Sequence, residues 1–208
     1  MNRYVGHEEI LAELQPVTLK NCTFKRFGSA NDGGYLMCEN LVQGIQSLYS
    51  YGIDTEDNWG CELSSQLKVP VHQYDCFTEA RPKCEKGYFV FHDECVGPKP
   101  ETIEGRQFDT LTNQIARNHD AVSRLIVKID VEGAEGSVLL GMRRTLADAK
   151  PVLFVECSDA GRETAWNLLQ DLGYRCQSAI TRRWVNTFAE YRHSDFLWLP
   201  ERLAGGSS

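Results

Sequence analysis

Short apolar segments alternate with segments of helical periodicity along most of the chain. The clearest strand pattern covers residues 124–131 (RLIVKIDV), where apolar residues are nearly continuous. Shorter apolar runs of the same kind cover residues 47–52, 71–75, 87–92, 151–157 and 194–200. Helical patterns cover residues 57–67, 108–115, 135–142 and 161–172, with Asp57 or Asn58 capping the first and Gly173 ending the last. This alternation predicts an α/β fold in which a mostly parallel central sheet has helices on both faces.

The two ends of the chain follow a different pattern. Residues 7–15 (HEEILAELQ) predict a short amphipathic helix that ends near Pro16. The last five residues (AGGSS) are typical of a flexible terminus. We therefore expect an N-terminal helical extension over residues 1–24, one domain over residues 25–203 and a flexible tail over residues 204–208. The whole chain could be one module of a larger polypeptide.

Composition narrows the class of protein. With 42% hydrophobic and 25% charged residues, the chain has the composition of a soluble globular domain. Lys and Arg number 22 against 29 Asp and Glu, a net charge of −7, which disfavours a dedicated nucleic-acid binder because such proteins neutralise phosphates with cations. No apolar run reaches the ~18 residues of a membrane span, and the N-terminus lacks the apolar stretch of a signal peptide. We expect a cytoplasmic protein without a membrane span.

The eight cysteines are widely spaced and contain no Cys-x-x-Cys pair, which argues against zinc-ribbon and thioredoxin-like sites. In a chain without a signal peptide, the sequence predicts that these residues are reduced and mostly buried thiols.

The residues that end the predicted strands carry the candidate chemistry, because ligands of parallel α/β sheets bind outside the carboxyl ends of the strands. The first strand ends in Gly52 and Asp54, the second in Asp75, and the fourth in Asp130 and Glu132. A glycine lets a ligand approach the backbone, and a carboxylate at the second strand can accept hydrogen bonds from ribose hydroxyls. Taken singly, these residues could equally be a turn glycine and solvated aspartates.

The loop after the first predicted strand argues against a dinucleotide as the ligand. The Gly-x-Gly-x-x-Gly pyrophosphate motif is missing, and the segment GIDTED is acidic where phosphates would need free backbone amides. A nucleoside that carries a cation in place of phosphates suits an acidic rim. S-adenosylmethionine, with its sulfonium and ammonium groups, is such a ligand.

The run KIDVEGAE (residues 128–135), between an apolar strand and a helix, resembles the signature of FkbM-type methyltransferases. The segments 26–37, 49–53 and 71–75 also fall where that family carries its N-terminal and cofactor motifs, so that the resemblance covers residues ~25–200 in order. It implies a class I methyltransferase, Rossmann-like fold and methyl transfer from S-adenosylmethionine to a hydroxyl, often of a sugar or glycan. One departure is that the first strand is not followed by Gly-x-Gly.

The resemblance also implies roles for individual residues. On the cofactor side, Gly52 would lie under the methionyl part, Asp54 would meet the ammonium and Asp75 would hold the ribose. His92 and Asp93 would lie at the adenine rim. Asp130 and Glu132 would face the transferring methyl group and the acceptor. Asp32 could contact cofactor or acceptor, although a turn-forming aspartate is an equal alternative.

A sugar hydroxyl must lose its proton during attack, and two means are available. One is a general base, for which His92, Asp130 and His193 are candidates, histidine being favoured by its ordinary pKa. The other is a divalent cation such as Mg²⁺ or Mn²⁺ bound by Asp130 and Glu156, with Asp159 as a third ligand. The alternative for these carboxylates is structural: Asp130 caps a helix and Glu156 pairs with an arginine.

Two other functions remain open from the sequence. A methyltransferase for nitrogen or for protein side chains usually carries an Asn/Asp-Pro-Pro-aromatic loop after the fourth strand, where this chain reads DVEGA. A non-catalytic scaffold with the same fold would explain the missing Gly-x-Gly, but not the carboxylates at the strand ends.

Overall fold

A computed structural model describes residues 23–30, 33–79, 81–120, 124–191, 195–201 and 203–204. The predicted helix at residues 7–15, Asp32, His193 and most of the expected tail lie outside these ranges. The strands are β1 (Phe24–Gly28), β2 (Gly34–Cys38), β3 (Ser47–Tyr51), β4 (Pro70–Tyr74), β5 (Tyr88–His92), β6 (Cys95–Val96), β7 (Glu101–Ile103), β8 (Arg106–Asp109), β9 (Leu125–Ile129), β10 (Val152–Glu156), β11 (Tyr174–Ser178), β12 (Trp184–Val185) and β13 (Asp195–Pro200). The helices are η1 (Glu39–Val42), α2 (Asn58–Leu67), α3 (Leu111–Asn118), α4 (Glu135–Gly141), α5 (Arg143–Asp148), α6 (Asp159–Asp171) and η3 (Phe188–Glu190).

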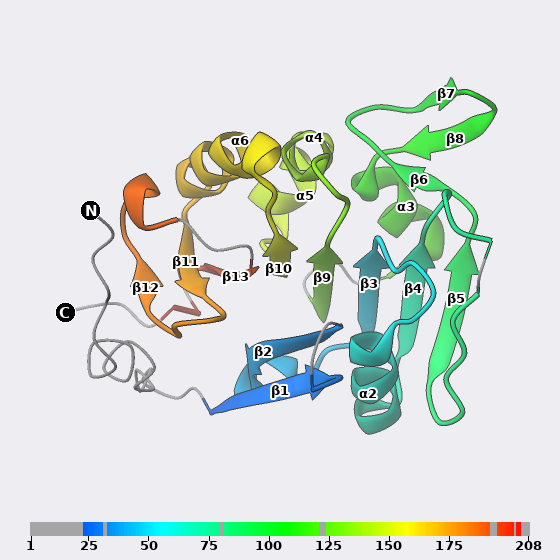
Figure 1. Ribbon diagram of the computed structural model, residues 1–208, viewed down its shortest axis with the longest axis horizontal. Coiled ribbons are helices and arrows are strands. Elements are labelled where there is room, and N and C mark those ends of the chain that lie inside the picture. The colour runs from blue at the N-terminus through cyan, green and yellow to red at the C-terminus, as the bar shows by residue number, and fades with distance from the viewer. Residues whose placement is uncertain are drawn as a thin grey trace, which may run out of the picture.

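An eight-stranded sheet forms the centre of the molecule, in the order β12-β11-β13-β10-β9-β3-β4-β5. Strands β5, β4, β3, β9 and β10 are parallel, and their carboxyl ends point to the top of Figure 1. The last strand, β13, runs antiparallel between β10 and β11. From β3 the chain adds strands toward β5, and from β9 it adds them toward β10, so the direction of winding reverses between β3 and β9 (Figure 1). This confirms the predicted α/β fold with a mostly parallel sheet.

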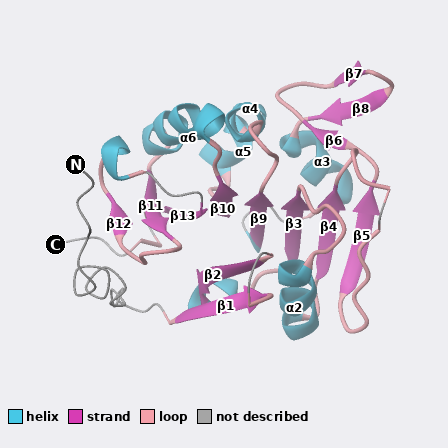
Figure 2. Cartoon of the chain, in the orientation of Figure 1, coloured by secondary structure: helices cyan, strands magenta, loops and turns pink. Residues whose placement is uncertain are grey.

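Both faces of the sheet are covered (Figure 2). Strand residues alternate between the two faces, as the neighbours Leu48 and Tyr49 show. Tyr49 belongs to a core shared with α3, α4, α5 and α6, whereas Leu48 belongs to a core shared with α2 and the β1–β2 hairpin. All five residues of β3 and of β9 are buried, which explains why both strands are largely apolar. Asp57 caps α2, as predicted, by accepting a hydrogen bond from the Gly60 amide.

The segment between β5 and α3 differs from the prediction. Instead of a polar connection followed by a helix at residues 108–115, the chain forms a small sheet in the order β6-β8-β7, and α3 begins only at Leu111. Phe108 pairs with Cys95 in this sheet. The helix begins later because the Thr110 hydroxyl accepts from the Asn113 amide as an N-cap. We call β6, β7 and β8 the accessory sheet; it lies at the carboxyl end of the central strands (Figure 1).

The prediction of reduced cysteines is wrong for most of the described ones. Cys61 is bonded to Cys84, and Cys76 to Cys95. Cys38 is also disulfide-bonded, whereas Cys157 and Cys176 are free and buried. The wide spacing in sequence concealed these pairs, because each joins segments that the fold brings together: α2 to the β4–β5 loop, and the end of β4 to the accessory sheet.

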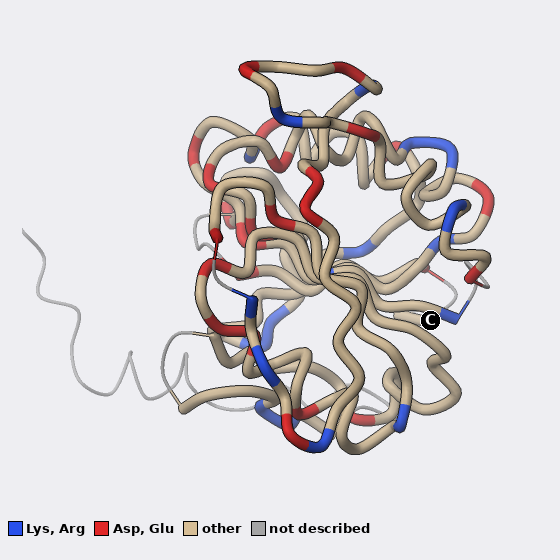
Figure 3. Tube along the Cα trace, turned by 90° about the vertical axis from the view of Figure 1, so that its right-hand side faces the viewer, with Lys and Arg blue, Asp and Glu red and all other residues tan. Residues whose placement is uncertain are grey.

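Within the part of the chain that the structure describes, no helix has both the length and the apolar character needed to cross a membrane. Figure 3 shows Asp and Glu positions on many of the loops at the left and top of that view, in keeping with the net charge of −7.

Side chains of β3, β4 and β5 form a stack of aromatic rings that contains two histidines. The His72 Nδ1 and His92 Nε2 atoms lie 3.1 Å apart, and the His92 ring stacks on Tyr74 at 4.3 Å. The opposite nitrogen of His72 lies 3.2 Å from an Asp120 carboxylate oxygen. Burial, together with the charges of His72 and Arg117, lowers the pKa of His92 to about 4, and burial also lowers the pKa of His72. Both rings are therefore neutral in the folded protein at pH 7.

These histidines predict a loss of stability in mild acid. Because unfolded histidine has a pKa near 6.5, the unfolded chain binds protons first as the pH falls. The contribution of these histidines to the free energy of unfolding should be fully present above about pH 7.5 and should decrease as the pH falls through about 6.5 toward 4. Urea unfolding at pH 7.5 and pH 5 measures the difference, and His92→Phe, which keeps the ring stack, should reduce it. An equal pH dependence in both proteins would contradict this account.

Candidate active site

A pocket of about 1010 Å³ opens at the carboxyl ends of the central strands. It lies where the winding of the sheet reverses between β3 and β9, the usual position of ligands in open α/β sheets. The walls come from the β1–β2 hairpin, the loops after β3, β4, β9 and β10, and the accessory sheet. The lining includes Gly33, Tyr35, Gly52, Ile53, Asp54, Glu56, Asp75, Cys76, Phe77, Thr78, Cys95, Val96, Phe108, Lys128, Asp130, Glu132 and Glu156.

The floor of the pocket is a close contact between two strand ends. Gly52 has a φ of +70°, and a Cβ atom there would lie 1.5 Å from the Asp130 carbonyl oxygen. The Asp130 amide in turn donates to the Tyr51 carbonyl at 3.1 Å. Gly52 thus lines the predicted cofactor pocket, but the structure gives a reason for glycine that the sequence did not reveal. The residue allows the backbones of β3 and β9 to meet.

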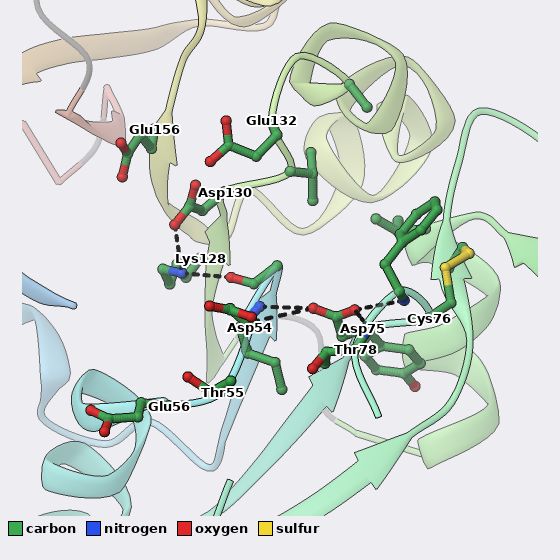
Figure 4. A pocket seen from close by; sticks show the side chains of 18 of the residues that line it. Asp54, Thr55, Glu56, Asp75, Cys76, Thr78, Lys128, Asp130, Glu132 and Glu156 are labelled. Carbon is green, nitrogen blue, oxygen red and sulfur yellow. Dashed lines mark hydrogen bonds and ion pairs between the residues drawn. A yellow bond between two sulfur atoms is a disulfide. The ribbon is translucent and has the colours of Figure 1, made fainter. Parts of the chain in front are cut away.

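Two carboxylates in the pocket lie on strained backbone. Asp54 follows β3 with a φ of +47°, and Glu132 follows β9 with a φ of +48°. Left-handed backbone costs an ordinary residue roughly 1–2 kcal/mol, and such conformations concentrate at functional sites. Among the described residues, none forms a hydrogen bond or ion pair with the Glu132 carboxylate. In Figure 4 the Glu132 side chain lies on the same side of the pocket as Asp130 and Glu156.

Asp75 occupies the centre of the pocket wall and fixes two loops (Figure 4). One carboxylate oxygen accepts from the amides of Ile53 and Asp54, at 3.2 and 3.3 Å. The other accepts from the amides of Phe77 and Thr78, at 2.8 and 3.0 Å. A carboxylate offers about four lone-pair sites, so these four donors engage its full capacity. Asp75 therefore shapes both sides of the pocket, and any contact with a ligand hydroxyl would have to share these lone pairs.

The structure adds Lys128 to the site. The side chain is only 6% exposed, and its ammonium donates to Asp130 at 3.0 Å and to the Gly52 carbonyl at 3.1 Å. Tyr35, from the N-terminal hairpin, donates to the same Asp130 oxygen at 3.4 Å. The orientation of Asp130 is thus fixed from two sides. The sequence contained a signal for this residue, a lysine within a buried strand, because such a cation needs a partner.

The expectation of a divalent cation is not supported. Asp130 and Glu156 both line the pocket, but the Lys128 ammonium already neutralises Asp130. Within the described ranges, no three His, Cys, Asp or Glu side chains are grouped so as to hold a metal ion. Asp159, the suggested third ligand, lies in the first turn of α6 and is paired with Arg162 at 3.2 Å.

The remaining predicted site residues do not line the pocket where the structure describes them. His92 ends β5 but is held in the ring stack by Tyr74 and His72, which removes it from the candidates for general base. Asp93, in the connection after β5, is exposed and is not part of the lining. Asp32 and His193 lie outside the described residues.

The accessory sheet supplies pocket residues that sequence reasoning missed. Cys95 and Val96 of β6 and Phe108 of β8 form one wall, next to Phe77, whose side chain is 74% exposed. Two-residue and four-residue strands have no detectable periodicity, so residues 95–109 gave no strand signal. Phe77, the aromatic residue two positions after Asp75, was the one indication in the sequence of an apolar surface here.

Comparison with known proteins identifies the family of the chain. Residues 69–176 match the family model described as "Methyltransferase FkbM domain", a range that contains Asp75, Asp130, Glu132 and Glu156. No curated protein matches the chain. Among solved structures, the chain is similar to the methyltransferase FkbM from Methylobacillus flagellatus KT, with 15% identity and a TM-score of 0.43 over 75% of this chain. The match covers 44% of that protein, so the present chain corresponds to less than half of its length.

The family match spans 108 of the 208 residues, from β4 to β11, and includes the ends of β4, β9 and β10 that line the pocket, whereas Gly52 and Asp54 after β3 precede it. The chain belongs to the FkbM methyltransferase domain family.

Proposed function

We propose that the pocket binds S-adenosylmethionine and that residues 25–203 form a domain that transfers its methyl group to a hydroxyl of a sugar or glycan. The observation that carries the proposal is the charge of the pocket. Six carboxylates line it, on Asp54, Glu56, Asp75, Asp130, Glu132 and Glu156, and the one Lys or Arg side chain in the described lining, Lys128, is paired with Asp130. An acidic pocket attracts a sulfonium and an ammonium and repels the phosphates of a dinucleotide.

The residues on the two sides of the pocket suit different parts of this cofactor. Asp54, two residues after Gly52 in the lining, would meet an ammonium group. Phe77 and Val96 offer apolar surface for a nucleobase beside Asp75. When bound, S-adenosylmethionine supplies an activated methyl group for in-line transfer, and the protein has to align the acceptor.

The acceptor side is formed by Asp130, Glu132 and Glu156. We assign the general base to Glu132, because its carboxylate lines the pocket on strained backbone and has no partner among the described residues. Asp130, held by Lys128 and Tyr35, is suited to orient an acceptor hydroxyl by accepting its hydrogen bond. Carboxylates also accept hydrogen bonds from the neighbouring hydroxyls of a polyol, which favours a carbohydrate acceptor.

Transfer can be tested with a panel of neutral mono- and oligosaccharides and S-adenosylmethionine carrying a labelled methyl group. We expect label in a sugar product together with release of S-adenosylhomocysteine, and no increase when magnesium replaces a chelator. Label only in peptide or amine acceptors would indicate an N- or protein-side-chain methyltransferase. Cofactor binding without transfer to any acceptor would indicate the non-catalytic scaffold.

Asp75→Ala should weaken the binding of S-adenosylhomocysteine by ten- to a hundredfold. Four backbone amides lose their acceptor, and the loops that carry Ile53, Asp54, Phe77 and Thr78 separate; bonds to a charged group are each worth about 1.5–3 kcal/mol. Calorimetric titration measures the change. Asp93→Ala, an exposed carboxylate outside the lining, is the control, and equal losses in both variants would contradict the assignment.

The disulfides provide evidence about the compartment in which the protein folds. Disulfides persist in oxidising compartments and are rare in the cytosol, whereas a cytoplasmic protein with reduced cysteines was expected from the sequence. We propose instead that the chain folds where disulfides can form. Mass spectrometry of the protein from its native source, after alkylation without reductant, tests this proposal: alkylated Cys61, Cys76, Cys84 and Cys95 would contradict it.

A further inference from the structure

The disulfide between Cys76 and Cys95 lies in the wall of the pocket, and both cysteines belong to the lining. Cys76 directly follows Asp75, and Cys95 begins β6 of the accessory sheet and is 4% exposed. Figure 4 shows the bond beside Asp75, across the pocket from Asp130, Glu132 and Glu156. The bond therefore joins the turn at the end of β4 to the accessory sheet on the side assigned to the nucleoside.

The other contacts of this turn include hydrogen bonds within the turn and contacts with Arg106. Its amides at positions 77 and 78 donate to Asp75 within the turn itself. The Arg106 Cζ atom lies 4.7 Å from the centre of the Phe77 ring. Because Phe77 is 74% exposed, burial of its side chain contributes little to the stability of the turn. Arg106 of β8 also donates to the Cys76 carbonyl at 3.1 Å. The disulfide and the half-exposed Arg106 are thus two contacts that join the turn to the accessory sheet.

The second disulfide provides a natural comparison. Cys61–Cys84 joins α2 to the β4–β5 loop, and neither residue lines the pocket. The two bonds close loops of similar length, with sequence separations of 23 and 19 residues. Because stabilisation by a disulfide depends mainly on loop length in the chain-entropy model, the two bonds should contribute similarly to global stability.

We propose that the Cys76–Cys95 disulfide is a positioning element of the cofactor site, which holds residues 76–78 in the conformation that binds the nucleoside. The inference rests on the proposed binding of S-adenosylmethionine. When the bond is opened, the turn must be ordered during binding, and this ordering lowers the affinity for the cofactor. The central sheet and the carboxylates of the pocket stay in place. Cys61–Cys84 has no such effect.

The first test compares two double variants, Cys76→Ser with Cys95→Ser and Cys61→Ser with Cys84→Ser. We expect similar decreases in the thermal midpoint, but an S-adenosylhomocysteine dissociation constant about tenfold higher in the first variant alone. Equal affinities in the two variants, or an equal loss in both, would overturn the inference. Absence of binding to the unmodified protein would instead reject the proposed function.

The second test uses the unmodified chain and does not depend on the folding of a variant. Dithiothreitol is oxidised to its cyclic disulfide as it passes two electrons and two protons to the bond, which becomes two thiols. Alkylation followed by mass spectrometry counts these thiols over time. Saturating S-adenosylhomocysteine should slow the appearance of Cys76 and Cys95 thiols and leave Cys61 and Cys84 unaffected. Equal rates for Cys76 and Cys95 with and without the ligand would contradict the proposal.

Discussion

Glu132→Gln is expected to reduce the turnover number for a hydroxyl acceptor by about 10²–10⁴-fold, the contribution of a positioned general base. The amide keeps the size of the side chain but cannot take a proton. Affinity for S-adenosylhomocysteine should change little, because the proposed mechanism assigns Glu132 to the acceptor and not to the cofactor. Initial rates of labelled methyl transfer, with dissociation constants from calorimetry, separate the two effects.

The chain contains a matched control for this variant. Glu104 is also a glutamate on left-handed backbone, with a φ of +49°, but it lies in the β7–β8 turn and does not line the pocket. Glu104→Gln should leave turnover unchanged. Replacement by glycine should relieve similar backbone strain at both positions and keep stability within about 1 kcal/mol. A Glu132→Gly protein that folds normally and still turns over would remove Glu132 from the mechanism.

Gly52→Ala should destabilise the fold by up to about 5 kcal/mol, the sum of left-handed strain and overpacking at the upper end of their ranges. The added Cβ would lie 1.5 Å from the Asp130 carbonyl oxygen, and backbone atoms cannot move aside as a flexible side chain can. Since small domains are stable by only 5–15 kcal/mol, little soluble protein is expected.

Gly44→Ala is the control for Gly52→Ala. Gly44 has a similar φ of +75°, but nothing lies within 4 Å of the Cβ position. This variant should cost only the ~1–2 kcal/mol of left-handed backbone. Urea unfolding of the two variants isolates the contact between β3 and β9. Equal stability of the two would show that the close approach at Gly52 is not a constraint.

Much of the fold could be predicted because the central strands are buried on both faces. The largely apolar sequences of β3, β9 and β10 indicated where these strands lie, and Asp57 marked the start of α2. The accessory sheet could not be predicted in this way, since strands of two to four residues have no period. Its contacts with the rest of the fold, such as the Cys76–Cys95 bond and the hydrogen bond from Arg106 to Cys76, join segments that no local sequence pattern relates.

The candidate site was predicted only in part, for a similar reason. Strand ends meet at one edge of a parallel sheet, and so Gly52, Asp75, Asp130 and Glu132 could be grouped from their order alone. The order of the strands does not show in which direction each side chain points. His92 ends a strand at the correct edge but faces Tyr74 and His72, while Lys128 enters the pocket from within a buried strand.

Calorimetric titration of the chain with S-adenosylhomocysteine tests the central claim most directly, that the acidic pocket between β3 and β9 is a cofactor site. The account predicts a single site with a dissociation constant in the micromolar range, about −8 kcal/mol, unchanged by a chelator and weakened in Asp75→Ala but not in Asp93→Ala. A folded protein that produces no binding heat across several temperatures, or equal affinities in all three proteins, would contradict it.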